Sequence, residues 1–442
     1  MNKNNVATLA FCVSFLTGCQ SLGTGMGSSE LRPPQQGSVA PPIELMSAAE
    51  PAKYTLTELV EFAIEQAPEV TQAQQRVKAS EFALQRQVSE RNPRLSGSAE
   101  LLSGNGFDDT AELALTQPLY TFGRAEAQEK RAALEAQVTR ADLKRVQRDT
   151  AVQTVDLYYD WRLSAAIRDE RRRATTESRA LLERIEQERA LGILSDAELT
   201  AAQLQHDKLE RALLNAETDE ERAHAELESA LNARLDKERL NSQATVLSEF
   251  SVITNEMIDA SVANDPALLV KSAELAVLDS EREVIEHANR PTLNAIAKLA
   301  RENFTTSDRT DSQGVGISFE FNMLPMGAMA AEVGEVQARY EAKLAEYESV
   351  YREARATLRR KQRSLDASVR RLEALEPALE RAERALASNR RQYSAGAADW
   401  RPYFASIAEV SEIRLTLVEA QLIGEAAIAR YTAQERWGRK DG

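Results

Sequence analysis

The side chains able to do chemistry are few and widely separated in this sequence. Its histidines are His206, His224 and His287, and the first two would lie about 27 Å apart along a helix, too far to share a metal. We predict that all three are solvated surface residues. Gly104-Asn105-Gly106 is followed by neither Lys-Ser nor a helix start, so it indicates a turn rather than a phosphate-binding loop. We therefore expect no catalytic site, no metal site and no cofactor.

The clearest chemical signal lies at Cys19. Lys3 precedes an apolar stretch from 6 to 16, and Leu16-Thr17-Gly18-Cys19 closes it. This pattern resembles a bacterial lipoprotein signal, which implies that residues 1–18 are removed and that the Cys19 thiol carries palmitate or similar acyl chains. The alternative is a chance cysteine after an ordinary signal peptide. In the lipoprotein sorting pattern, Gln20 in place of Asp favours the outer membrane. Residues 19–53, rich in Gly, Ser and Pro, are then a lipid-anchored flexible tether.

Composition narrows the classes of protein that remain. Charged residues make up 28% of the 442 residues, with only 18 Gly and 13 Pro, which is typical of long helices. The net charge of −14 argues against nucleic-acid binding, since no basic excess exists to displace counterions from phosphates. No run of 18 or more apolar residues occurs, which excludes a transmembrane helix and leaves a β route across a membrane open.

Two stretches predict very long helices. No glycine or proline occurs from 125 to 190, and we predict one helix over 124–190 and a second over 328–393. Pro377 should kink the second. Each long helix ends at a glycine, Gly192 or Gly396, and returning helices are predicted over 196–232 and 403–434. A shorter helix precedes each hairpin, and the pieces between the helices can form a girdle at mid-length.

The chain repeats itself. Pro266 follows Pro68 by 198 residues, and Pro291 follows Pro93 by the same number. We place the first structural repeat at 54–245, the second at 246–437, and a short tail at 438–442.

Each repeat contains a predicted β-hairpin, at 94–118 and at 292–323. Apolar residues alternate with polar ones along all four strands, as in Leu113 and Leu115 against Glu112 and Thr116. A strand with one apolar face and one polar face is suited to lie between lipid and a water-filled bore. The alternative for any single hairpin is a half-buried hairpin on a soluble domain.

The helix tips are the best functional candidates, because converging helix ends can close a bore. Charged residues follow both tip glycines and could form charged rings or bridges between chains. The alternative is that Asp196 only caps a helix. The candidate tip or gate residues are Gly192, Asp196, Glu198, Gly396, Asp399 and Arg401.

A further motif joins the first hairpin to the first long helix, Gln117-Pro118-Leu119-Tyr120-Thr121-Phe122-Gly123-Arg124, and Leu324-Pro325-Met326-Gly327 is a degenerate second copy. With the lipoprotein signal and the duplicated hairpin and helix, it resembles the TolC-like outer-membrane channel family of efflux and type I secretion. The resemblance implies a mainly α fold with a small transmembrane β part: a homotrimer whose β-barrel, four strands per chain, continues into a long α-helical tunnel. Its junction residues here are Pro118, Tyr120, Phe122, Gly123, Arg124 and Pro325.

The resulting hypothesis is a passive exit duct in the bacterial outer membrane that extends into the periplasm. A periplasmic adaptor (membrane fusion) protein and an inner-membrane transporter would open its tips. An oligomer is also required physically, because four strands cannot close a barrel, eight enclose a filled interior, and twelve leave a water-filled bore. The alternative is a lipid-anchored periplasmic coiled-coil adaptor or scaffold without a channel, with an enzyme a distant third. The sequence leaves the cargo open between a small molecule, a metal ion and a protein.

Overall fold

The structure is a computed structural model, and it describes residues 43–44, 54–101, 109–240, 255–302, 310–320 and 327–438. The chain divides into two units, Met1–Ile43 and Glu44–Gly442, and the elements discussed below belong to the second. The expectations for the signal peptide, Cys19, the tether, the Gly104-Asn105-Gly106 turn and Pro325 lie outside the described residues.

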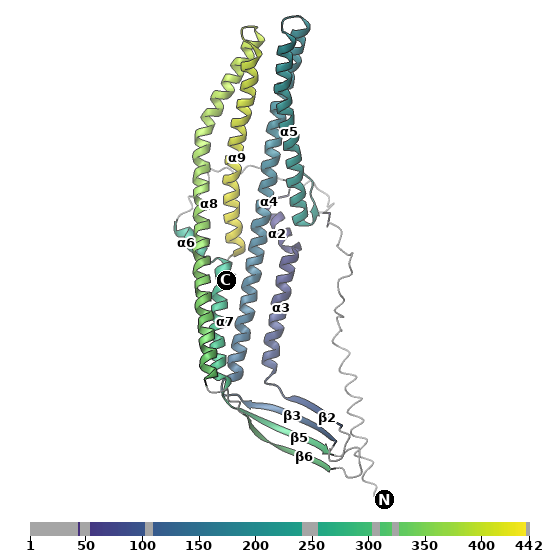
Figure 1. Ribbon diagram of the computed structural model, residues 1–442, viewed down its shortest axis with the longest axis vertical. Helices are drawn as coiled ribbons and strands as arrows, with labels where there is room; N and C mark the ends of the chain where they lie inside the picture. The colour runs from purple at the N-terminus through teal and green to yellow at the C-terminus, as the bar shows by residue number, and fades with distance from the viewer. Residues whose placement is uncertain are drawn as a thin grey trace. The chain divides into compact units, whose positions relative to one another are not determined.

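Helices dominate the second unit, with a small antiparallel sheet, as the sequence predicted (Figure 1). The helices are α2 (Leu56–Gln66), α3 (Pro68–Ser89), α4 (Arg124–Ala190), α5 (Asp196–Leu231), α6 (Asn255–Ala263), α7 (Pro266–Ala288), α8 (Ala328–Ser394) and α9 (Trp400–Gly438). The strands are β1 (Ile43–Glu44), β2 (Arg94–Glu100), β3 (Thr110–Tyr120), β4 (Ala233–Arg234), β5 (Thr292–Glu302) and β6 (Thr310–Glu320). No helix among the described residues combines the length and the apolar character needed to cross a membrane.

Local chemistry explains most helix ends. Thr55 and Glu58 form a capping box at the start of α2, and Pro68 and Pro266 begin α3 and α7, where a missing N–H costs nothing. The predicted start of the last helix at 403 was wrong, because α9 begins at Trp400 and carries Pro402 in its first turn. Proline is tolerated in a first turn, since no intrahelical hydrogen bond is lost there.

The helices form a single layer of antiparallel neighbours (Figure 1). α4 packs against α3 and α7 in the half nearer the sheet and against α5 and α9 in the half nearer the tips, while α8 packs against α7 and then α9. Two shorter helices therefore follow one another along each long one. α3 and α5 lie along one edge of the layer and α8 lies along the other. α8 is continuous through Pro377 and curves in the part nearer its tip (Figure 1).

The sheet has the order β2-β3-β5-β6, all antiparallel. Its register places Leu113 opposite Leu299 and Gly97, so the apolar positions of all four strands share one face. That face is open to solvent in the single chain, where Val315 is 90% exposed and Ile317 71%. The other face is polar and carries the ion pair between Lys298 and Glu112 at 2.8 Å.

The main core lies at mid-length, where α2 packs onto α4 through Leu59, Val60, Ala63 and Ile64. α6 packs onto α8 through a smaller cluster at the same level. These contacts form the described part of the predicted girdle. On the tip side of this core, the Arg162 guanidinium lies 2.8 Å from the Glu425 carboxylate and 5.3 Å from the ring centre of Tyr159. Burial raises the pKa of Tyr159 to about 12.

Two of the histidine predictions were wrong. His206 and His224 are buried, and only His287 is partly exposed. His206 Nδ1 is hydrogen-bonded to Ser178 Oγ at 2.8 Å, and burial is the main cause that lowers the pKa of His224. Both residues fall on the side of α5 that packs on α4.

Removing one partner of the buried Arg162–Glu425 pair should be costly. We expect Arg162→Met to lower the free energy of unfolding by about 3–5 kcal/mol, because it leaves a buried carboxylate unpaired. The double variant Arg162→Met/Glu425→Leu should recover most of this loss, whereas breaking the exposed Arg384–Glu380 pair should cost less than about 1 kcal/mol. Denaturant unfolding of the purified protein measures all three, and a double variant no more stable than Arg162→Met would contradict the assignment.

Candidate gate at the helix tips and the sheet junction

Both tip loops have the same pattern of backbone hydrogen bonds. After α4, the amide of Ile193 donates to the Glu188 carbonyl and that of Gly192 to Arg189; after α8, Ala397 donates to Gln392 and Gly396 to Tyr393. This is the Schellman arrangement, in which the residue after the cap adopts a left-handed conformation. Gly192 and Gly396 have φ of +76° and +70°, with nothing within 4 Å of an added Cβ. Backbone conformation, rather than space, therefore requires glycine there.

The acidic residues of the first tip loop, Asp196 and Glu198, make hydrogen bonds within that loop. Ser195, not Asp196, caps α5 and forms a capping box with Glu198. Asp196 instead accepts a hydrogen bond from Arg189 Nε at 2.6 Å across the loop, and this bond lowers the pKa of the Asp196 carboxyl. Asp196 is thus an intraloop partner in the single chain.

The second tip reaches toward the first. Asp399 Oδ1 accepts from the backbone N–H of Trp400 at 2.7 Å, while Arg401 pairs with Asp399 and lies 3.8 Å from Glu198. The structure therefore brings Glu198, Asp399 and Arg401 of the predicted set together. These side chains are exposed, so the link is weak in the isolated chain.

A stronger link between the two tips was missed in the sequence. The hydroxyl of Tyr393, a buried residue, donates to Glu188 Oε2 at 2.9 Å. Arg184 lies 5.0 Å from the Tyr393 ring centre, 3.3 Å from Glu188 and 3.2 Å from the Ser394 hydroxyl. Burial and the Glu188 carboxylate raise the pKa of Tyr393. This group ties the end of α4 to the end of α8.

Aromatic side chains support that link. Trp400, Tyr403, Phe404 and Tyr393 are buried in one cluster with Leu181 and Ile185 of α4, and Tyr403 donates to Glu177 at 3.2 Å. The signal that could have revealed the link is this concentration of aromatics between 393 and 404, in a chain with only 5% aromatic residues.

The sheet junction is built around Gly123. Its φ is +90°, and a Cβ there would lie 2.8 Å from His287 Cδ2, so both conformation and space require glycine. Arg290 donates to the Phe122 carbonyl at 2.9 Å, which joins the two repeats at this point. Tyr120 and Phe122 are exposed and meet edge to face at 4.5 Å, and the β3–β5 register shifts between Pro118 and Tyr120. Arg124 is the first residue of α4. Gly327, at the second junction, has open space around it.

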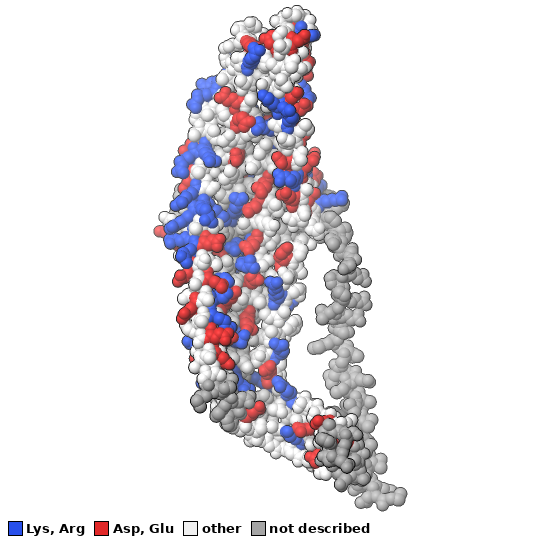
Figure 2. All heavy atoms as spheres, viewed as in Figure 1, with Lys and Arg blue, Asp and Glu red and all other residues white. Residues whose placement is uncertain are grey.

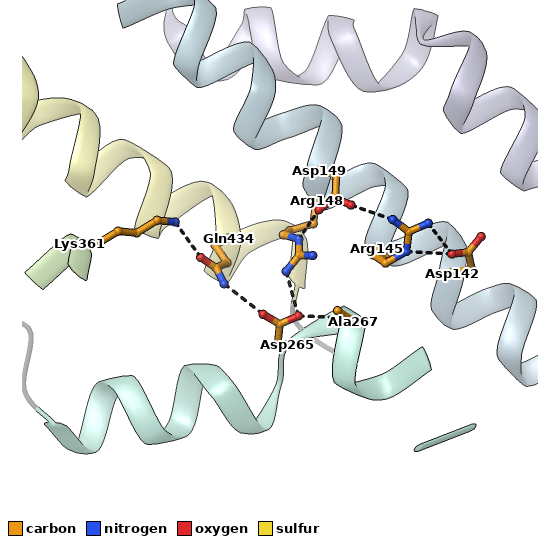
Figure 3. Close-up of polar contacts among 8 residues, drawn as sticks. All are labelled: Asp142, Arg145, Arg148, Asp149, Asp265, Ala267, Lys361 and Gln434. Atoms are coloured by element: carbon orange, nitrogen blue, oxygen red, sulfur yellow. Dashed lines mark hydrogen bonds and ion pairs between the residues drawn. The ribbon is translucent and has the colours of Figure 1, made fainter. Parts of the chain in front are cut away.

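A polar joint holds the mid-length of the helical layer (Figure 3). Asp265 caps α7 and accepts from Arg148 of α4 at 2.9 Å and from Gln434 of α9 at 3.4 Å, while Lys361 of α8 donates to Gln434 at 3.2 Å. These residues line a cavity of about 430 Å³. Burial lowers the pKa of Lys361. Within the described ranges, no cluster of three or more His, Cys, Asp or Glu side chains could hold a metal ion.

Comparison with known proteins gives a consistent picture. Residues 257–431 match the family model described as "Outer membrane efflux protein", and no curated protein sequence matches the chain. The fold is similar to that of the CmeC outer membrane channel of Campylobacter jejuni (TM-score 0.74, 13% identity, 87% of this chain and 86% of that one). It is also similar to the open state of the MtrE outer membrane channel of Neisseria gonorrhoeae (0.72, 14%, 88% and 89%) and to the outer membrane protein VceC of Vibrio cholerae (0.70, 15%, 86% and 95%). The chain therefore has the fold of these channels.

The raised pKa of Tyr393 predicts that the link between the two tips weakens at alkaline pH. The stabilisation is present below the ordinary tyrosine pKa of about 10 and is lost as pH rises through the higher folded value. In an absorbance titration of tyrosinate, Tyr393→Phe should remove a late-ionising group that wild type shows. Tyr351→Phe, which changes an exposed tyrosine, is the control. Because Tyr159 also ionises late, the readout is the amplitude of the late phase, and an amplitude in the Tyr393→Phe protein equal to that of wild type would contradict the assignment.

Proposed function

We propose that this chain is one protomer of an outer-membrane exit duct of a tripartite efflux or type I secretion system. The observation that carries the proposal is the union, in one chain, of a sheet with an exposed apolar face and helices of 67 residues that end in linked tips. The matched family model and the shared channel fold support it. The duct is passive, and an inner-membrane transporter supplies the energy.

The exposed apolar sheet face supports placement in a membrane. Leu95, Leu113, Leu299, Ile317 and Phe319 project from it, each at least 47% exposed in the single chain. A surface of this kind is unfavourable in water and favourable against lipid tails. The polar face would then line the bore.

The open sheet edges support assembly of several copies. Among the described strands, β2 and β6 each pair with one neighbour only, so each leaves a row of backbone groups unsatisfied, which lipid does not tolerate. Pairing β2 of one copy with β6 of the next satisfies both edges. Three copies supply twelve strands, enough for a water-filled bore, so the proposed assembly is a homotrimer. Cys19 would add a lipid anchor in the outer membrane.

The linked tips support a gate at the periplasmic end. The Tyr393–Glu188 hydrogen bond and the Arg401–Glu198 pair hold the end of the α8–α9 hairpin against the α4–α5 hairpin. A periplasmic adaptor that engages the tips would separate the hairpins by replacing these contacts. The cargo is left open between small molecules, metal ions and proteins.

Reconstitution in planar bilayers tests this function. We expect crosslinked trimers of wild type to conduct rarely, and Tyr393→Phe/Glu188→Gln to raise the open fraction at least about fivefold, the equilibrium change expected for one lost hydrogen bond. Replacing Asp399 and Arg401 by alanine should add to this effect. The matched control is Tyr351→Phe/Glu353→Gln, which changes exposed residues at mid-length. A protein that stays monomeric and never conducts, even with Asp399 and Arg401 replaced, would refute the duct.

A further inference from the structure

The middle of α8 is the most basic stretch of the chain. Eight Lys and Arg and only two acidic residues lie between Arg352 and Arg371, in a protein of net charge −14. Figure 2 shows Lys and Arg gathered along this edge of the molecule at mid-height. Most of the described arginines elsewhere are ion-paired, as Arg140 is with Glu81 at 2.7 Å. Within the described residues, six exposed arginines of this stretch have no ion pair: Arg352, Arg359, Arg360, Arg363, Arg370 and Arg371. Arg352 and Arg360 donate to groups of their own helix, the Glu348 carbonyl and the Thr357 hydroxyl, so the other four arginines are those without a described partner.

These arginines lie on the side of α8 that no described helix covers. Arg359, Arg363 and Arg370 are spaced by four and seven residues, which keeps them on one side of a helix. Leu358 and Leu365, on the packed side, are buried against α6 and α9. The arginine stripe, Arg359–Arg363–Arg370–Arg371, therefore points away from the packed side, along an edge that stays open in the single chain.

The opposite edge of the same helical layer carries unpaired acids. Glu65 at the end of α2, Glu69 at the start of α3, and Glu221 and Glu226 on α5 are exposed, and none forms an ion pair among the described residues. Burial and the nearby carboxylates of Asp156 and Glu226 raise the pKa of Asp160, which indicates an excess of negative charge at this level.

The two sets lie at the same height. Arg184 of α4 contacts Ser394 of α8 and Glu188 contacts Tyr393, and the two helices run in the same direction, so α8 residues lie level with α4 residues about 205–210 lower in number. Arg370 is therefore level with Asp160 of α4, which lies close enough to Glu226 of α5 for that carboxylate to raise the pKa of Asp160. α3 runs antiparallel to α4, and Ser80 of α3 contacts Thr139 of α4. Glu69 of α3 is therefore level with Thr150 of α4 and hence with Arg359 of α8. Glu65 lies about one turn further along, level with Arg363.

From this match we propose that the arginine stripe docks on Glu65, Glu69, Glu221 and Glu226 of a second copy of this chain. The inference rests on the proposed ring of copies. Rotation about a ring axis preserves height, so the free α8 edge of one copy meets the α3–α5 edge of the next at the same level. Each interface then holds a ladder of Arg–Glu pairs at mid-length. The ladder fixes the axial register of neighbouring copies and disfavours contact between two like edges.

Charge exchange between the edges tests the ladder. Three variants are compared with wild type in detergent: Arg363→Glu/Arg370→Glu, Glu65→Arg/Glu226→Arg, and the combination of all four changes. Each two-residue variant should raise the concentration for half-assembly at least tenfold, because every interface then carries like charges, and added salt should reduce the defect. The combined variant should assemble within about threefold of wild type, which a folding defect could not produce.

Arg381→Glu/Arg384→Glu on the same helix is the matched control and should assemble like wild type. Equal assembly of all variants, or a combined variant no better than the two-residue ones, would overturn the ladder. Unchanged assembly with altered ion selectivity in bilayers would show that the stripe lines the bore, which also overturns it. A wild-type protein that assembles but never conducts would refute the duct, while the ladder would still be judged by assembly.

Discussion

Satisfaction of the backbone at the two open edges of the four-stranded sheet is the constraint on which the rest of the proposed assembly depends. In the part of the chain that the structure describes, β2 and β6 each have one hydrogen-bonded neighbour, while the face between them is apolar and exposed. Lipid offers no hydrogen bonds, so this sheet is stable in a membrane only when further strands continue it. In the proposed ring of copies, closure of the sheet would also close the helical layer, which joins the sheet at Gly123 and Gly327.

The helical layer is one helix thick, and the cluster that links its tips is separate from the core that packs its middle. Two shorter helices follow each other along a long one, and the gap between them is filled by the mid-length core and by the joint around Asp265. At the tips, the apolar cluster has fewer buried residues than the mid-length core, and the Tyr393–Glu188 hydrogen bond joins α4 to α8. In the proposed gate, these tip contacts are the ones that must break, while the mid-length core need not change.

Local pattern in the sequence predicts the elements well and their contacts poorly. The absence of Gly and Pro from 125 to 190 locates α4, and alternation of apolar and polar residues locates the strands and their apolar face. The Tyr393–Glu188 link joins residues 205 positions apart, and no local rule connects them. His206 and His224 were assigned to solvent, yet the packed side of α5 buries them. The tip glycines were predictable because helix ends need a left-handed residue.

The most direct measurement of the central claim is the environment of neighbouring sheet positions in lipid. Single nitroxide labels at Ile317 and Ser318, and at Leu299 and Lys298, sample opposite faces of β6 and β5 in the protein reconstituted in liposomes. The account predicts that labels at Ile317 and Leu299 collide with oxygen dissolved in the bilayer, while those at Ser318 and Lys298 collide with a water-soluble nickel complex. Equal exposure of both faces to water would contradict the placement of this sheet in a membrane.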